Sequence, residues 1–144
     1  MSVLKNEIIP FIEKNYNVNG DRGIEGHSLG GWFAAYCLLQ EPELFNRYGI
    51  NSPALWWDND KIFEIEKSYS EKNKNLNAQV FITVGSKEGD EMVPKMTAFA
   101  DTLKAHNYTG LTLASQIFEG EEHFSVIPAS ISRTLSVLYA VRRK

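Results

Sequence analysis

A Gly-x-Ser-x-Gly turn between a strand-like run and a helical run constrains the fold of this chain more than any other feature. The turn, Gly26-His27-Ser28-Leu29-Gly30, ends the strand-like segment 22–27 and begins an apolar helical run over 30–40. In such a turn the chain reverses sharply from strand to helix, and the serine hydroxyl is exposed at the top of a sheet. We expect glycines on both sides of Ser28 because a Cβ there would clash with the strand or the helix. We also expect Gly31 to let the helix pack closely on the sheet.

Strand and helix patterns alternate along the rest of the chain, which predicts βαβ units and a parallel sheet with right-handed crossovers. The expected fold is a single α/β domain over residues 1–144, with about four parallel strands flanked by helices. The further strands are predicted at 48–51, 79–84 and 111–118. Helices are predicted at 3–16 (interrupted by Pro10), 30–40, 61–71, 93–106 and 125–142. The polar segment 71–77 is interpreted as a solvated helix end and loop, and the segment 58–60 as an N-cap cluster.

Composition and charge exclude several classes of partner. The net charge is −3 with both signs interspersed, so we expect no nucleic-acid partner. No apolar run approaches the length of a membrane span, and we expect no membrane partner. The N-terminal residues lack the pattern of a secretory signal, which favours a cytoplasmic protein. The single cysteine, Cys37, lies in an apolar helical run, and one cysteine allows no internal disulfide.

Chemically capable side chains follow three of the four predicted strands. Ser28 follows the first strand, Glu88 and Asp90 follow the third, and His123 follows the fourth. Because chemistry in parallel sheets collects at the carboxyl ends of strands, we expect these side chains at one edge of the sheet. A serine is a weak nucleophile until a base takes its proton, and a histidine oriented by an acid can be that base. The order serine, acid, histidine is typical of an α/β-hydrolase triad.

The segment after the second strand and the residues around His123 suggest further roles. Trp56 and Trp57 are adjacent indoles on a loop after a strand, and we expect at least one of them to line a substrate pocket. His27, beside the serine, is expected to pack near the same pocket. Glu121 and Glu122 beside His123 have no histidine or cysteine partner at ligand spacing. We therefore predict no metal and no cofactor.

Four segments carry a resemblance to a known family: IEGHSLGGWFA, NSPALWW, FITVGSKE and GEEHFSV. They resemble the C-terminal half of the putative-esterase (esterase D-like) branch of the α/β hydrolases, which includes siderophore esterases. The resemblance implies that Ser28 is the nucleophile, His123 the base and Glu88 the acid, with Asp90 as the alternative acid. The N–H of Leu29, just after the serine, is the expected oxyanion donor. The implied activity is hydrolysis of small carboxylic esters.

The resemblance also implies what this chain lacks. In the full fold further strands precede the nucleophile strand, and a loop after one of them provides a second oxyanion donor. We therefore expect a truncated α/β-hydrolase whose activity is impaired. The strand leading to Ser28 should have an unpaired edge, which invites a homo-oligomer through strand pairing unless helix 3–16 covers that edge. Two alternatives stay open: an inactive fragment that acts as an assembly or binding module, and a thioesterase or peptidase on the same scaffold.

Overall fold

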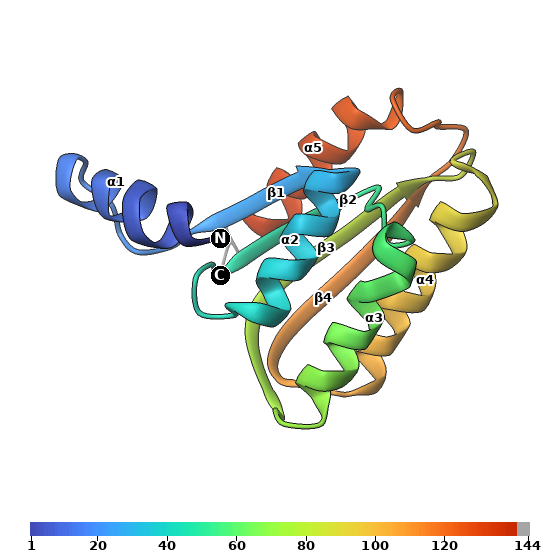
Figure 1. The fold of residues 1–144 in the computed structure, drawn as a ribbon. Helices are drawn as coiled ribbons and strands as arrows, with labels where there is room; N and C mark the ends of the chain where they lie inside the picture. Colours follow the sequence, from blue (N-terminus) through green and yellow to red (C-terminus); the bar gives the residue numbers. More distant parts are fainter. Residues whose placement is uncertain (141–144) are drawn as a thin grey trace.

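The computed structural model describes residues 1–140 and contains one parallel sheet with helices on both faces (Figure 1). The chain begins with a π-helical turn, η1 (Leu4–Ile8), that continues into α1 (Ile9–Asn15). Strands and helices then alternate: β1 (Gly23–His27), α2 (Leu29–Gln40), β2 (Arg47–Asn51), α3 (Trp57–Ser70), β3 (Asn75–Gly85), α4 (Gly89–Ala105), β4 (Thr109–Phe118) and α5 (Val126–Leu138).

The sheet has the order β1-β2-β3-β4, and each strand pairs in parallel with the next. Helices α2, α3 and α4 lie on one face, whereas α5 lies on the other (Figure 1). The predicted α/β class with four parallel strands is therefore confirmed. Because β1 pairs only with β2, its outer edge has no strand partner among the described residues.

The two faces of the sheet differ in chemistry. The face toward α2, α3 and α4 is apolar, with fully buried side chains such as Ile50, Ile82 and Phe99. The face toward α5 contains a buried polar cluster, in which Asn51 Oδ1 accepts hydrogen bonds from Thr83 Oγ1 at 2.8 Å and Thr134 Oγ1 at 3.0 Å. Parallel strands covered on both faces read as nearly continuous apolar runs, which explains why β3 was the clearest strand in the sequence.

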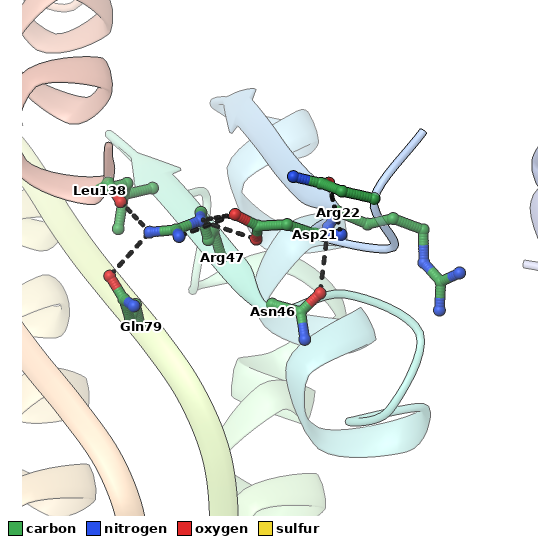
Figure 2. A network of polar contacts seen from close by, with 7 residues as sticks. Asp21, Arg22, Asn46, Arg47, Gln79 and Leu138 are labelled. Carbon is green, nitrogen blue, oxygen red and sulfur yellow. Dashed lines mark hydrogen bonds and ion pairs between the residues drawn. The ribbon is translucent and has the colours of Figure 1, made fainter. Parts of the chain in front are cut away.

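Arg47, at the start of β2, joins the beginning of the sheet to the end of the last helix (Figure 2). Its guanidinium forms an ion pair with Asp21 at 2.8 Å and donates to Gln79 Oε1 at 2.9 Å. It also donates to the backbone carbonyl of Leu138, the last residue of α5, and lies over the Tyr139 ring. A cation at a helix C-terminus satisfies carbonyls that have no partner within the helix.

Two polar segments differ from the prediction. Helix α3 begins at Trp57, and residues 58–60 lie inside its span with positive φ angles between 52° and 61°. No side-chain cap is present at this end, so the N-cap interpretation was wrong. The expected loop 71–77 was also misjudged at its end, because residues 75–77 already belong to β3. Alternating burial there, with Leu76 buried and its neighbours exposed, gave too short an apolar run to be recognised.

The terminal helices also differ from expectation. Pro10 does not end the first helix: η1 continues into α1, and Pro10 lies at the start of α1, where the π-helical geometry changes to α-helical. Helix α5 ends at Leu138, and residues 141–142 of the predicted helix lie outside the described residues. Helix α1 lies beyond the start of β1 and not along its edge (Figure 1). Several of its apolar side chains are exposed, including Phe11 at 58%. Among residues 1–140 no helix has the length and apolarity needed to cross a bilayer.

Candidate active site

Ser28 lies at the turn between β1 and α2 in a strained backbone conformation. Its φ of 59° and ψ of −118° fall outside the regions that L-residues favour. Such a conformation costs about 1–3 kcal/mol and persists only where surrounding contacts hold it. Two backbone hydrogen bonds hold this turn: Ser28 N–H donates to Asn51 C=O at 3.0 Å, and Ala54 N–H donates to Ser28 C=O at 3.1 Å. The end of β2 and its following loop therefore clamp the turn.

The glycines of the turn differ in how much space a side chain would have at each position. A Cβ on Gly26 would lie 2.2 Å from the Gly30 carbonyl oxygen, and one on Gly31 would lie 2.7 Å from the Asn51 oxygen. These two positions require glycine, as the sequence predicted. A Cβ on Gly30 would meet nothing within 4 Å. The expectation that Gly30 avoids a clash was wrong, because its Cβ would point into open space.

Glu88 and His123 form a close carboxylate–imidazole pair. Glu88 Oε2 lies 2.6 Å from His123 Nδ1, and the Glu88 side chain is fully buried while that of His123 is 31% exposed. An ionised carboxylate only accepts hydrogen bonds, so Nδ1 is the donor and Nε2 of the neutral ring is left as an acceptor. Of the two acids considered, the structure brings Glu88 to His123. Asp90 lies in the first turn of α4 and is exposed.

The second oxygen of Glu88 is held from two sides. Glu88 Oε1 accepts a hydrogen bond from Ser52 Oγ at 2.5 Å and another from the Gly85 backbone N–H at 2.6 Å. Ser52 is fully buried and has a φ of 41°. Sequence reasoning did not assign Ser52 a role in the site. Its position directly after β2, at the edge where the other site residues follow their strands, was the available signal.

His27 packs against His123, with ring centroids 4.5 Å apart and planes inclined by 40°. This contact places His123 beside the turn that holds Ser28. Both ring nitrogens of His27 are buried and have no hydrogen-bond partner among the described residues. Burial lowers the pKa of His27, and the neighbouring His123 lowers it further. His27 is therefore a neutral ring between the strand and the imidazole of His123.

The other residues predicted for the site are Leu29, Trp56 and Trp57. Leu29 is the first residue of α2, and the first N–H groups of a helix have no partner within it. Ser28 Oγ forms no hydrogen bond to His123 in the described part of the chain. Trp56 and Trp57 follow the loop that clamps Ser28, and their side chains are 42% and 46% exposed. Among the described residues no hydrogen bond or aromatic pair joins either indole to Ser28 or His123, and the two indoles pair with each other at 6.1 Å between ring centroids.

The site contains no cluster suited to a metal. Among residues 1–140 no group of three or more histidine, cysteine, aspartate or glutamate side chains is arranged to hold an ion. Glu121, next to the site, instead accepts a hydrogen bond from Ser125 Oγ at 2.5 Å. The groups that can act chemically here are therefore a strained serine, an imidazole with a free nitrogen, and a buried carboxylate.

Comparisons with known proteins find relatives with the same architecture. The ferri-bacillibactin esterase BesA of Bacillus subtilis is 28% identical over 138 residues, which cover 92% of this chain and 48% of that protein. The crystal structure of the BES protein from Bacillus cereus superposes with a TM-score of 0.86 at 34% identity, covering 95% of this chain and 52% of that one. The siderophore hydrolase EstA from Aspergillus nidulans shares the fold, with a TM-score of 0.82 at 20% identity over 96% of this chain and 56% of that one.

This chain spans about half the length of the curated relatives it matches. The Putative esterase family matches residues 1–127, which include Ser28, Glu88 and His123. The fold, the strand-to-helix turn and the match over most of the chain agree, and the chain belongs to the Putative esterase family.

Proposed function

We propose that this chain provides the nucleophile, base and acid of a carboxylic ester hydrolase, with Ser28, His123 and Glu88 in those roles. The observation that carries the proposal is the hydrogen bond between His123 Nδ1 and Glu88 Oε2 at 2.6 Å. It leaves Nε2 free, and the His27–His123 ring contact brings that imidazole to the turn holding Ser28.

The proposed reaction follows from these positions. Ser28 Oγ attacks the ester carbonyl carbon while His123 Nε2 takes the hydroxyl proton, and Glu88 stabilises the imidazolium that forms. His123 then gives the proton to the leaving alkoxide, which departs as an alcohol. Water, deprotonated by His123, attacks the acyl-serine and releases the carboxylic acid with Ser28 restored. We expect the hydrogen bond between Ser28 Oγ and His123 Nε2 to form when substrate is bound, since catalytic hydrogen bonds are often loose without it.

Substrate class and strength of activity are inferred from the family. One relative is named a ferri-bacillibactin esterase and another a siderophore triacetylfusarinine C esterase, which supports a small-molecule ester as the substrate. The N–H of Leu29 is the proposed oxyanion donor, and the resemblance places a second donor outside these residues. Because losing one such donor costs about 10²–10³ in turnover, we expect weak turnover of activated esters by this chain alone.

Covalent labelling of Ser28 by a fluorophosphonate probe tests the proposal more directly than turnover. We expect labelling and p-nitrophenyl acetate hydrolysis in the unchanged chain, and neither in Ser28→Ala or His123→Ala. Ser68→Ala, an exposed serine on α3, is the matched control and should label normally. Absence of labelling in folded protein would refute the proposal and favour an inactive binding module. The same assay with thioester and peptide substrates tests the alternatives of a thioesterase and a peptidase.

We also propose that the chain forms a homodimer through the free edge of β1. The edge is unpaired in the sheet, and the apolar side chains of α1 beyond it are exposed. An unpaired strand edge beside apolar surface favours pairing with another strand. An isologous pair would join two four-stranded sheets into one.

A further inference from the structure

His123 lies in a segment without regular structure that does little to orient its ring. Strand β4 ends at Phe118 and α5 begins at Val126, so four residues separate His123 from the strand. The neighbouring Phe124 ring is 5.3 Å away, but it is 79% exposed and is a weak support. The orientation of His123 therefore depends on side chains from elsewhere in the fold.

The hydrogen bond to Glu88 fixes only one point of the His123 ring. A ring held at Nδ1 can still pivot about that contact and carry Nε2 away from Ser28. The face of His27 removes this freedom, because the two rings are 4.5 Å apart and inclined by 40°. This separation is at the close end of the range for interacting aromatic rings.

The two imidazole rings of His27 and His123 make this contact, and their planes are tilted relative to each other. Neither Nδ1 nor Nε2 of His27 has a hydrogen-bond partner among the described residues, although both are buried. Burial lowers the pKa of His27 and the charge of His123 lowers it further, whereas Glu88 and the backbone of His123 raise it in part. A neutral ring at this position avoids charge repulsion when His123 takes up a proton, and its π-face attracts the imidazolium that forms.

We propose that His27 is a positioning residue whose ring holds the His123 imidazole in the plane that keeps Nδ1 on Glu88 and directs Nε2 toward Ser28. The inference deepens the proposed function, since it takes from it the role of His123 as base. The contact between the His27 and His123 rings can be tested without measuring activity.

Proton NMR of the His123 Nδ1–H resonance tests this directly. We expect a slowly exchanging, hydrogen-bonded imidazole proton in the unchanged chain, assigned by its loss in His123→Gln and by its persistence in Ser28→Ala. His27→Phe keeps a ring face without nitrogens, so it should retain this resonance and label with the fluorophosphonate within about threefold of the unchanged rate. His27→Ala removes the face, so it should lose the resonance to exchange and label at least about tenfold more slowly, as displaced catalytic groups do.

The variants also separate the possible failures. If His27→Ala unfolds in urea much earlier than the unchanged chain, His27→Leu replaces it, since leucine fills the space without a ring. An unchanged resonance in both the Ala and Leu variants would overturn the proposal. A Phe variant as impaired as the Ala variant would also overturn it, because the nitrogens would then be essential. Loss of the resonance in His27→Ala, without any labelling of Ser28 in the unchanged chain, would support the role of His27 and refute the proposed esterase function.

Discussion

His27 is a residue whose cost to the fold can be measured. Its two buried nitrogens have no hydrogen-bond partner within residues 1–140, and an unsatisfied buried polar group costs about 1–3 kcal/mol. Its pKa lies below the ordinary value of 6.5 because burial and the nearby His123 disfavour the charged ring. A residue with these properties destabilises the folded chain as the solution becomes acidic.

The change from His27 to Phe should therefore flatten the dependence of stability on pH. Above pH 6.5 neither the folded nor the unfolded chain binds a proton at His27, and below it the unfolded chain takes up a proton that the folded chain resists. The free energy of unfolding should fall as pH is lowered, by less than about 1.4 kcal/mol per pH unit because the ring is only partly buried.

Urea unfolding of both proteins at about pH 7.5 and about pH 5.5 measures this difference. His106 is present in both proteins, so its contribution cancels in the comparison, and His123→Gln in both proteins removes the titration that is coupled to His27. Equal pH dependence in the two proteins would contradict the lowered pKa of His27.

The site residues show how far sequence reasoning reached. The alternation of strands and helices was enough to place Ser28, Glu88 and His123 at one edge, because parallel strands end on the same side of a sheet. The choice of Glu88 over Asp90 depends on the turn after Gly85, in which one carboxylate faces the sheet and the other continues into α4. No sequence pattern specifies that geometry. The contact of His27 with His123 joins residues 96 positions apart, and no sequence pattern predicts it either.

Among the elements, α2 owes its close approach to the sheet to one glycine. A Cβ on Gly31 would lie 2.7 Å from the backbone oxygen of Asn51, where neither strand nor helix can yield. The neighbouring Gly30 faces open space in the same helix turn. The two glycines therefore form a matched pair with opposite expected behaviour.

Gly31→Ala should lower the free energy of unfolding by about 1–3 kcal/mol, because overpacking forces backbone to shift. Gly30→Ala should raise it by a few tenths to about 1 kcal/mol, because alanine favours helix more than glycine does. Urea unfolding measures both changes in the free energy of unfolding. The comparison requires that this free energy depends on urea concentration with the same slope in both variants. Equal destabilisation by both changes would mean that the turn, and not the packing of α2, sets the requirement.

Element boundaries were less predictable than element types. The span of α3 includes three residues with positive φ, Asp58, Asn59 and Asp60, at which two helical stretches meet across a kink, so its regular part follows them at the predicted start. Asparagine and aspartate adopt this conformation more readily than other non-glycine residues do. Strand β3 begins four residues early because pairing with β4 from Asn75 onward extends it beyond its apolar centre. For β3 this pairing overrides local preference, which is why the polar sequence before its apolar centre was misleading.

At the scale of the whole molecule, the free edge of β1 places an acidic residue where a second copy would pair. Antiparallel pairing of Gly23–His27 with itself centres on Glu25 and sets two Glu25 side chains directly opposite. Like charges in that arrangement are destabilising. Desolvation already raises the pKa of Glu25, while hydrogen bonds from the neutral Asn51 and Thr134 lower it in part.

The proposed dimer should therefore strengthen as the pH falls. Pairing raises the pKa of Glu25 further, so the dimer binds more protons than two monomers and gains stability on acidification. Sedimentation velocity at about pH 7.5 and about pH 5 should show a lower dissociation constant at the lower pH. Glu25→Gln should dimerise more tightly at neutral pH and lose most of the dependence. A monomer under all these conditions would exclude pairing through β1.

The strand order described above has a consequence for how the chain reaches this structure. Because every strand pairs with the one before it in sequence, the sheet can grow by one strand and helix at a time, and each step closes a modest loop. Helix α5 departs from this pattern, since it returns to β2 and β3 from the far end of the chain. The Arg47 contact with the Leu138 carbonyl joins residues 91 positions apart, and the entropy of closing such a loop grows with its length. Docking of α5 is thus the step at which early and late segments of the chain first meet.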